Sequence, residues 1–319
     1  MSEMILRPTS PGELTESLAG AHARGERISH VDLTALHRLV EHTVEDMTAT
    51  VEAGMMLGAF QTELAKRGQW LPVDPPNAGR LSIAELLATD PSGPRRFGCG
   101  TVRDYLIGMK VVLAEGRIIS SGGKVVKNVA GYDLAKLFIG SSGSLGAIIE
   151  ATFKLLPLPE VEKFVQVSCA SLSEADKMAG TVLNSELTPV VFDLHNTPGK
   201  DGQRAVGSTL VLGFAGTNEE VEWQFSKAGG LGFNETSSLD YEREFWTEPD
   251  SIRKTSVLPS RMVEILGAME SARFVARAGN GIIYSRGATK RERCQTSSKL
   301  AERLKDEFDP KRILPDSTM

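Results

Sequence analysis

The chain of 319 residues carries 36 Lys and Arg against 41 Asp and Glu, and the net charge of −5 argues against a nucleic acid or an anionic membrane as its main partner. Its three cysteines, Cys99, Cys169 and Cys294, lie far apart without a Cys-x-x-Cys spacing, which excludes an iron–sulfur or zinc site made by this chain alone. The composition, 41% apolar and 24% charged, is that of a globular protein, and the length favours two domains.

Local signals mark the first elements of the chain. Ser10 suits the N-cap of a helix, Glu13 stands where it can complete a capping box, and Gly25 is placed to end that helix. Residues 47–53 alternate as a half-buried strand does. The other elements predicted in this half are a helix carrying Met56, Phe60 and Leu64, a β-hairpin over 110–120 and a strand over 147–155.

Pro157 and Pro159 interrupt the chain, and we place a domain boundary there, dividing it into residues 1–158 and 159–319. Helical and strand patterns alternate beyond this boundary, which predicts a smaller α+β, ferredoxin-like domain with helices on one face of a mixed sheet. The predicted strands lie near 161–168, 189–194, 208–214, 253–258, 272–278 and 281–285, and the predicted helices near 173–185, 217–228, 240–247, 259–270 and 289–307.

Glycine is concentrated between Gly93 and Gly146. Backbone without side chains lets amides approach an anion closely, although ordinary turns are the alternative explanation. Two standard nucleotide motifs are absent, because Arg103 replaces the third glycine of a Gly-x-Gly-x-x-Gly pattern and Ile118 replaces the first glycine of a Walker A loop. The cluster therefore predicts another kind of phosphate site.

Three arginines lie among these glycines beside the hydroxyl of Thr101: Arg95, Arg96 and Arg103. Guanidinium groups, a hydroxyl and free amides together suit a pyrophosphate. The alternative is that these arginines are solvated or paired with Asp104 and Glu115, because surface charges often have no other role.

Several segments of the chain together resemble a known family. They are Ser-Gly-Pro-Arg-Arg-Phe-Gly at 92–98, Thr-Val-Arg-Asp at 101–104, Lys-Asn-Val-Ala-Gly-Tyr-Asp at 127–133, Leu-Phe-Ile-Gly-Ser-Ser-Gly-Ser-Leu-Gly at 137–146, Glu-Ala-Thr-Phe-Lys at 150–154 and Phe-Asp-Pro-Lys-Arg-Ile-Leu at 308–314. This set is similar to the FAD-binding domain of the vanillyl-alcohol oxidase and p-cresol methylhydroxylase (PCMH) type, and within it to the FAD-binding E subunit of bacterial glycolate oxidase.

The resemblance implies a PCMH-type FAD-binding domain of two α+β subdomains, followed by the smaller α+β domain. It also implies the residues that would contact FAD. Residues along the pyrophosphate and ribityl chain would be Ser92, Gly93, Gly98 and Thr101. The turn at Gly143 to Gly146 and the strand at Ile148 would contact the adenine or isoalloxazine part. Residues 127–133 would lie near the flavin ring, where Asp133 also suits a helix N-cap.

The chain departs from the family pattern in two places. A glycine-rich loop that normally holds the pyrophosphate is missing between Arg24 and Asp32. Ala84 and Glu85 stand where the family has two glycines, so a carboxylate replaces backbone beside the dianion unless it turns outward to water. Each hydrogen bond lost to a charged group is worth about 1.5–3 kcal/mol, so FAD binding would weaken.

Two functions follow from the resemblance and from these departures. The first is an FAD-binding subunit of a glycolate-oxidase-like complex, which oxidises a small 2-hydroxy acid and passes electrons to a second flavin subunit and an iron–sulfur subunit. The second is a degenerate assembly subunit that no longer binds FAD tightly. No catalytic base stands out: His195 follows a strand and could act as a base or be structural, and the histidine spacings predict no metal site.

No apolar run of about 18 residues and no basic-then-apolar leader is visible. We therefore expect a cytoplasmic protein that is peripheral to the inner membrane, if at all, through its partners.

Overall fold

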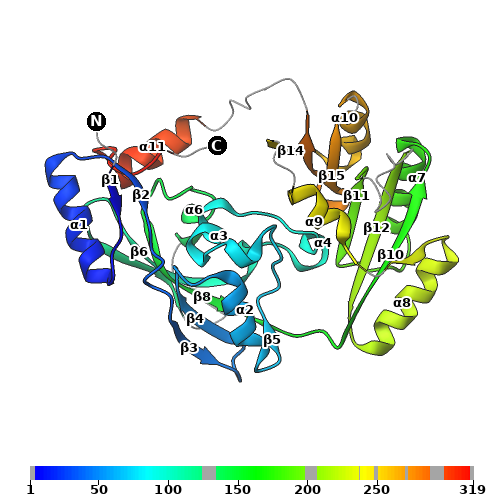
Figure 1. The fold of residues 1–319 in the computed structure, drawn as a ribbon, viewed down its shortest axis with the longest axis horizontal. Coiled ribbons are helices and arrows are strands. Elements are labelled where there is room, and N and C mark those ends of the chain that lie inside the picture. The colour runs from blue at the N-terminus through cyan, green and yellow to red at the C-terminus, as the bar shows by residue number, and fades with distance from the viewer. Residues whose placement is uncertain are drawn as a thin grey trace.

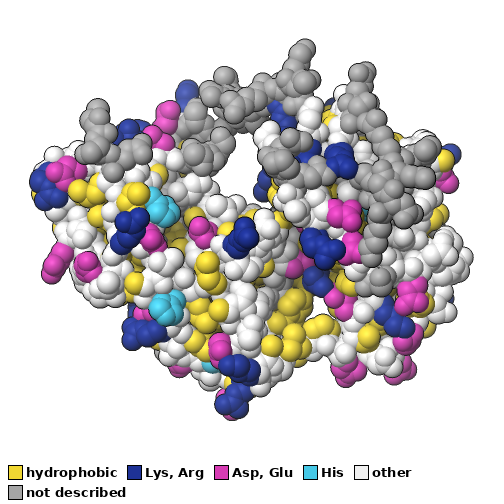
Figure 2. Space-filling model, in the orientation of Figure 1, with side chains coloured by type: hydrophobic (Ala, Val, Ile, Leu, Met, Phe, Trp, Pro, Cys, Tyr) yellow, Lys and Arg dark blue, Asp and Glu magenta, His cyan; other side chains and the backbone are white. Residues whose placement is uncertain are grey.

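The computed structural model describes residues 4–123, 134–197, 207–236, 238–247, 251–269, 272–287 and 298–316. Two units lie side by side, each built on its own sheet (Figure 1). Acidic and basic side chains are interspersed over the face seen in Figure 2, and this face is hollowed between the two units. The predicted α+β class is confirmed.

The first unit contains a five-stranded antiparallel sheet in the order β3-β4-β8-β6-β7 and a parallel pair, β1 with β2. Its strands are β1 (Met4–Leu6), β2 (Ile28–Val31), β3 (Leu39–Thr43), β4 (Thr48–Glu52), β5 (Gln69–Trp70), β6 (Leu106–Val112), β7 (Ile118–Gly122), β8 (Ala147–Lys154) and β9 (Leu156–Pro157). Its helices are α1 (Pro11–Arg24), α2 (Leu57–Ala65), α3 (Ile83–Thr89), α4 (Arg96–Cys99), α5 (Val102–Tyr105) and α6 (Ala135–Phe138), with a 3-10 turn at Ala78–Arg80.

Most elements predicted for this unit are present. The Ser10 hydroxyl accepts a hydrogen bond from the Glu13 amide at the start of α1, and Gly25 ends the helix in the left-handed conformation. Strands β6 and β7 form the predicted hairpin. The half-buried pattern expected for residues 47–53 is wrong, because all five residues of β4 are buried. This strand lies between β3 and β8, and even its Glu52 is buried in an ion pair with Arg38.

The second unit is a seven-stranded sheet in the order β13-β10-β12-β11-β15-β16-β14. Its strands are β10 (Val161–Cys169), β11 (Val191–His195), β12 (Ser208–Gly216), β13 (Asn234–Thr236), β14 (Ile252–Ser256), β15 (Arg273–Arg277) and β16 (Ile282–Arg286). Its helices are α7 (Leu172–Leu183), α8 (Asn218–Gly230), α9 (Asp240–Thr247) and α10 (Met262–Ala268), with 3-10 turns at Pro259–Arg261 and Ala278–Asn280. The expected mixed sheet is wrong, since every strand pairing in it is antiparallel.

The last helix, α11 (Ser298–Phe308), returns to the first unit and lies near β1 (Figure 1). Leu304 and Phe308 pack against the first core, and Ile313 and Leu314 belong to it. The Ile28 amide also donates a hydrogen bond to the Ile313 carbonyl at 2.7 Å. We retain the boundary at residues 158 and 159 as a proposal, with one amendment: the C-terminal segment belongs with the first unit.

Residues 92–98 connect the two units. Phe97 packs edge-on against Phe192 of the second core, with ring centroids 5.3 Å apart. The Gly98 amide donates to the Val190 carbonyl at 3.1 Å. Arg95 donates to Glu162 of β10 at 2.7 Å. These contacts attach the segment firmly to the second sheet.

Candidate functional site

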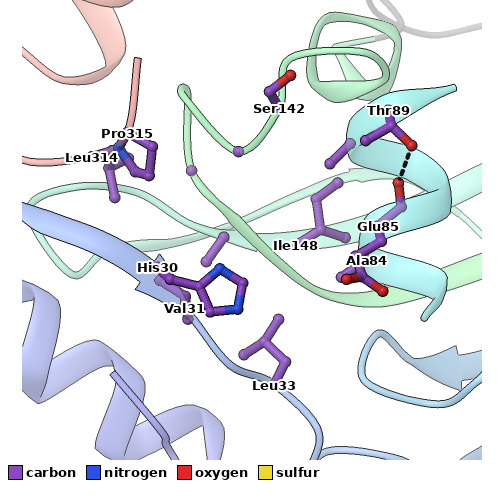
Figure 3. Close-up of a pocket in the computed structure, with 14 residues that line it drawn as sticks. His30, Val31, Leu33, Ala84, Glu85, Thr89, Ser142, Ile148, Leu314 and Pro315 are labelled. Atoms are coloured by element: carbon purple, nitrogen blue, oxygen red, sulfur yellow. Dashed lines mark hydrogen bonds between the residues drawn. The ribbon is translucent and has the colours of Figure 1, made fainter. Parts of the chain in front are cut away.

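A crevice of about 300 Å³ opens between β2, α3, the turn at 141–146, the start of β8 and the C-terminal segment (Figure 3). In Figure 3, His30 and Leu33 lie on one side of it and Ala84 and Glu85 on the other. Most of the wall is apolar or small, which suits a flat ring better than a flexible chain. The lining residues are His30, Val31, Leu33, Ala84, Glu85, Ala88, Thr89, Ser142, Gly143, Gly146, Ala147, Ile148, Leu314 and Pro315.

Glycine is required in the turn that forms one wall. Gly143 has a φ of +76°, in the left-handed region that other residues rarely adopt. A Cβ at Gly146 would lie 2.6 Å from Cγ1 of Val111. The backbone of this turn therefore comes close to β6 and to the crevice at once.

A buried lysine fastens the opposite wall to this turn. The Lys305 ammonium donates to the carbonyl of Ser144 at 2.9 Å, and to those of Leu314 at 3.0 Å and Pro315 at 3.1 Å. It also pairs with the buried carboxylate of Asp309 at 2.8 Å. Since Leu314 and Pro315 line the crevice, Lys305 holds the C-terminal wall in place.

The N-terminus of α3 is capped by side chains of the helix itself and of its N-cap residue. The Ser82 amide and hydroxyl both donate to Oε2 of Glu85 at 2.8 Å, and the Glu85 amide donates to the Ser82 hydroxyl at 3.2 Å. This reciprocal capping box turns the Glu85 carboxylate back over the helix start. The side chain is exposed, yet it lines the crevice and a smaller neighbouring cavity of about 140 Å³.

Three of the seven predicted contact residues line the crevice, namely Gly143, Gly146 and Ile148. The other four, Ser92, Gly93, Gly98 and Thr101, do not. The structure gives each of them a packing, bonding or capping role, so their contact with a cofactor stays a prediction. Residues 127–133 lie outside the described ranges.

The roles of those four residues explain why these residue types occur there. A Cβ at Gly93 would lie 1.9 Å from the Asp74 carbonyl oxygen, and one at Gly98 would lie 2.6 Å from the Cα of Val190. The buried Ser92 carbonyl accepts from Tyr284 at 3.4 Å. Thr101 begins α5, where its amide donates to Asp104 at 2.8 Å.

The three arginines predicted for a pyrophosphate do not line the crevice either. Arg95 pairs with Asp74 at 2.8 Å and with Glu162, which are not the partners named in our alternative. Burial raises the pKa of Asp74 to about 6, and the Arg95 guanidinium acts against that rise. Arg96 donates to the Ser92 hydroxyl, and Arg103 donates to the Lys136 carbonyl at 3.1 Å.

A buried ionic cluster at the contact between the two units was missed in the sequence. The Arg277 side chain is 1% exposed and pairs with the carboxylates of Asp193 and Glu242. Tyr241 donates to Asp193 at 2.7 Å, and Arg277 reaches the Ser92 carbonyl at 3.3 Å. Because Arg277 bonds to both carboxylates and to the Ser92 carbonyl, this cluster ties the second sheet to residue 92.

His195 lies beside this cluster in the second unit. The residue is 7% exposed, and its ring stacks on the ring of Tyr241 with centroids 4.2 Å apart. Nδ1 accepts from the Thr197 amide at 3.2 Å, and burial lowers the pKa of His195 to about 3. The placement supports the structural alternative for His195 over the role of a base.

The low pKa of His195 makes the fold sensitive to acid. Between pH 3 and about 6.5 the unfolded chain binds a proton here that the folded chain does not, so stability falls as the pH drops through this window. This residue alone should lower the free energy of unfolding by about 2 kcal/mol from pH 7 to pH 5. Urea unfolding at both pH values should show that loss reduced in His195→Gln and unchanged in His37→Gln, which alters an exposed residue. Equal losses in wild type and His195→Gln would contradict the prediction.

Two features are absent from the described ranges. No helix there combines the length and hydrophobicity needed to cross a lipid bilayer. No three His, Cys, Asp or Glu side chains there are grouped so as to hold a metal ion.

Comparison with known proteins identifies the first unit. Residues 12–122 match the family model of the FAD binding domain. Over these residues the chain is similar to an FAD binding domain. The FAD binding domain therefore covers β2 and α3, which form part of the crevice wall. The predicted resemblance to PCMH-type flavoproteins is confirmed, and FAD is the cofactor of this family.

Several curated proteins are similar to parts of the chain. The chain is 34% identical over 163 residues to glycolate oxidase subunit GlcD of Bacillus subtilis, which covers 51% of this chain and 35% of that protein. It is 33% identical over 149 residues to glycolate oxidase subunit GlcE of Escherichia coli, covering 46% of this chain and 42% of that protein. A mitochondrial D-lactate dehydrogenase [cytochrome] of Arabidopsis thaliana is 30% identical over 235 residues, which covers 68% of this chain and 40% of that protein. The chain thus spans less than half the length of these relatives.

The fold extends beyond the FAD binding domain. A solved structure of alkyldihydroxyacetonephosphate synthase superposes with a TM-score of 0.73 at 17% identity, covering 97% of this chain and 76% of that one. At this identity the likeness shows the fold alone. Both units of the chain therefore have counterparts in one known architecture.

The described residues fit one part of FAD and not another. The crevice volume lies near the lower end of the range of about 300–1,000 Å³ for ligand pockets, and its apolar walls suit a heterocyclic ring. The FAD diphosphate does not fit, because the Ser82 amide and hydroxyl are taken by Glu85 and the described lining residues include a carboxylate and neither Lys nor Arg.

Proposed function

We propose that this chain is a subunit of a glycolate-oxidase-like complex that oxidises a small 2-hydroxy acid, with glycolate converted to glyoxylate, and that FAD is its cofactor. The observation that carries the proposal is the FAD binding domain over residues 12–122. The names of its relatives support the substrate class, because glycolate oxidase, D-lactate dehydrogenase and D-2-hydroxyglutarate dehydrogenase act on 2-hydroxy acids.

The proposal includes partner subunits. An iron–sulfur cluster needs about four cysteine ligands, and this chain has only 3 cysteines without a suitable spacing. Electrons would therefore pass to a second flavin subunit and an iron–sulfur subunit. Such partners would also account for any peripheral association with a membrane.

A second candidate function is favoured by the capping box at Ser82 and Glu85. In this case the chain keeps the fold for assembly of the complex and binds FAD weakly or not at all. The poor fit between the described residues and the FAD diphosphate supports this alternative. The contacts of residues 92–98 with the second unit would preserve the overall shape without a cofactor.

The flavin content of the complex distinguishes the two functions. The complex should be purified with and without this chain, denatured, and analysed for FAD released per mole of the partner flavin subunit. The first function predicts a ratio of about two with this chain and about one without it; the assembly function predicts about one in both. Full glycolate oxidation by a complex that lacks this chain would contradict both functions.

A further inference from the structure

We propose that Glu85 determines the charge of the ligand that this crevice accepts, so that an uncharged nucleoside-like ring binds and each added phosphate weakens binding. The inference goes beyond the proposed function and rests on it only in treating the crevice as the ligand site. A crevice that disfavours phosphate would agree with the second candidate function, in which FAD is bound weakly. It follows from the position of one carboxylate, the charges around it and the chemistry of the walls.

The Glu85 carboxylate is held where it is. Its Oε2 accepts two hydrogen bonds of 2.8 Å from Ser82, and Glu85 in turn donates its amide to the Ser82 hydroxyl. Swinging the side chain out to water would break both bonds to Oε2 and uncap α3. A ligand in the crevice therefore meets a fixed negative charge on the side formed by α3.

Among the described residues that line the crevice, no cationic side chain balances this charge. Among its described lining residues are one carboxylate, one imidazole, and neither Lys nor Arg. Arg80 lies in the smaller neighbouring cavity, but Asp32 lies there too, and Glu85 lines both. A phosphate placed beside Glu85 would therefore be repelled, with no Lys or Arg among the described lining residues to offset the repulsion.

The remaining surface suits a neutral ring with N–H donors. Val31, Ile148 and Leu314 provide apolar contact, and Ala84 and Gly143 leave room for a flat group. Acceptor oxygens of Glu85 and Ser142 can receive hydrogen bonds from a base. Nucleosides combine an uncharged ring with such donors, and adenosine is the simplest probe of this class.

Calorimetric titration of the purified full chain with adenosine, AMP and ADP tests the inference. At low salt we expect adenosine to bind at least about tenfold more tightly than ADP, because a unit charge a few Å from a diphosphate gives repulsion of that order. The difference should shrink at about 0.5 M salt, where exposed charges are screened. AMP should lie between the two.

Glu85→Gln is the matched variant, because glutamine keeps the hydrogen bonds of a capping box without the charge. It should tighten ADP binding about tenfold and change adenosine binding less than about twofold. Glu16→Gln, an exposed change on α1 outside the crevice, should alter neither. Unfolding curves of both variants show whether the fold is kept, and the salt dependence of the wild type tests the inference independently.

Two results would overturn the inference: ADP or FAD binding as tightly as adenosine, or no adenosine binding at millimolar concentration. The first would leave the proposed FAD function standing and strengthen it. Failure of the proposed function has a different signature, which is an unchanged flavin ratio in the purified complex. The two failures are therefore distinguishable.

Discussion

Replacing Arg277 by Met is expected to destabilise the protein by about 3–5 kcal/mol. The Arg277 side chain is 1% exposed and is the partner of two carboxylates, those of Asp193 and Glu242. Removing it leaves the fully buried Asp193 and the largely buried Glu242 without their cation, so the folded protein must hold an unpaired charge or take up a proton there. Urea unfolding at pH 7 should show a clear fall in the midpoint.

The effect should depend on pH in a defined direction. Burial raises the pKa of Asp193 to about 7, and Arg277 acts against that rise. Without Arg277 the folded protein would hold a proton on Asp193 that the unfolded chain releases above about pH 4, so the stability of the variant falls as the pH increases. The difference between variant and wild type should be smaller at pH 5 than at pH 8.

Two comparisons separate this explanation from a general loss of packing. Arg243→Met removes an exposed ion pair on α9 and should change stability by less than about 1 kcal/mol. A triple variant with Asp193→Leu, Glu242→Leu and Arg277→Met removes all three charges and should be more stable than Arg277→Met alone. A triple variant less stable than the single one would show that the unpaired charges are not the cause.

Local signals predicted local structure well. The helix between Ser10 and Gly25 and the hairpin over 110–120 depend on neighbouring residues, and both form as expected. The capping box at Ser82 and Glu85 has the same kind of signature, Ser-x-x-Glu. We interpreted these residues only as a departure from a glycine turn, so the helix that they begin was missed although its signal was present.

Long-range packing was predicted less well. Arg277 meets Asp193 and Glu242 across sequence separations of 84 and 35 residues, and no local pattern indicates such a meeting. The glycines at 93 and 98 were assigned to a ligand, while the structure shows them packed against Asp74 and Val190. Close backbone packing and close approach to a phosphate both need glycine, and the sequence does not distinguish them.

The C-terminal segment shows the same limit. Residues 308–314 resemble the family, but they lie far from the FAD binding domain in the sequence. We therefore assigned them to the second domain by their position in the chain. The structure returns them to the first core through Ile313 and Leu314. Lys305, which holds them there, has the helical surroundings of an ordinary exposed lysine, and only its four oxygen partners reveal its role.

Lys305→Met is expected to destabilise the protein by about 3–5 kcal/mol and also to weaken ligand binding in the crevice. Asp309 is fully buried and would lose its cation, and the carbonyls of Ser144, Leu314 and Pro315 would lose their donor. Asp309 still accepts from the amides at 313 and 314, so the segment is expected to loosen rather than detach.

The double effect of Lys305→Met distinguishes it from a change confined to the core. Adenosine binding should weaken because Leu314 and Pro315 form a wall of the crevice, and the weakening should be similar for ADP because Lys305 carries no selectivity for phosphate. Lys299→Met, an exposed change on the same helix, should leave stability and binding within about 0.5 kcal/mol. If Lys305→Met unfolded at the wild-type urea concentration, Lys305 would not hold this wall, and the C-terminal segment would be kept in place by the apolar contacts of Ile313 and Leu314 alone.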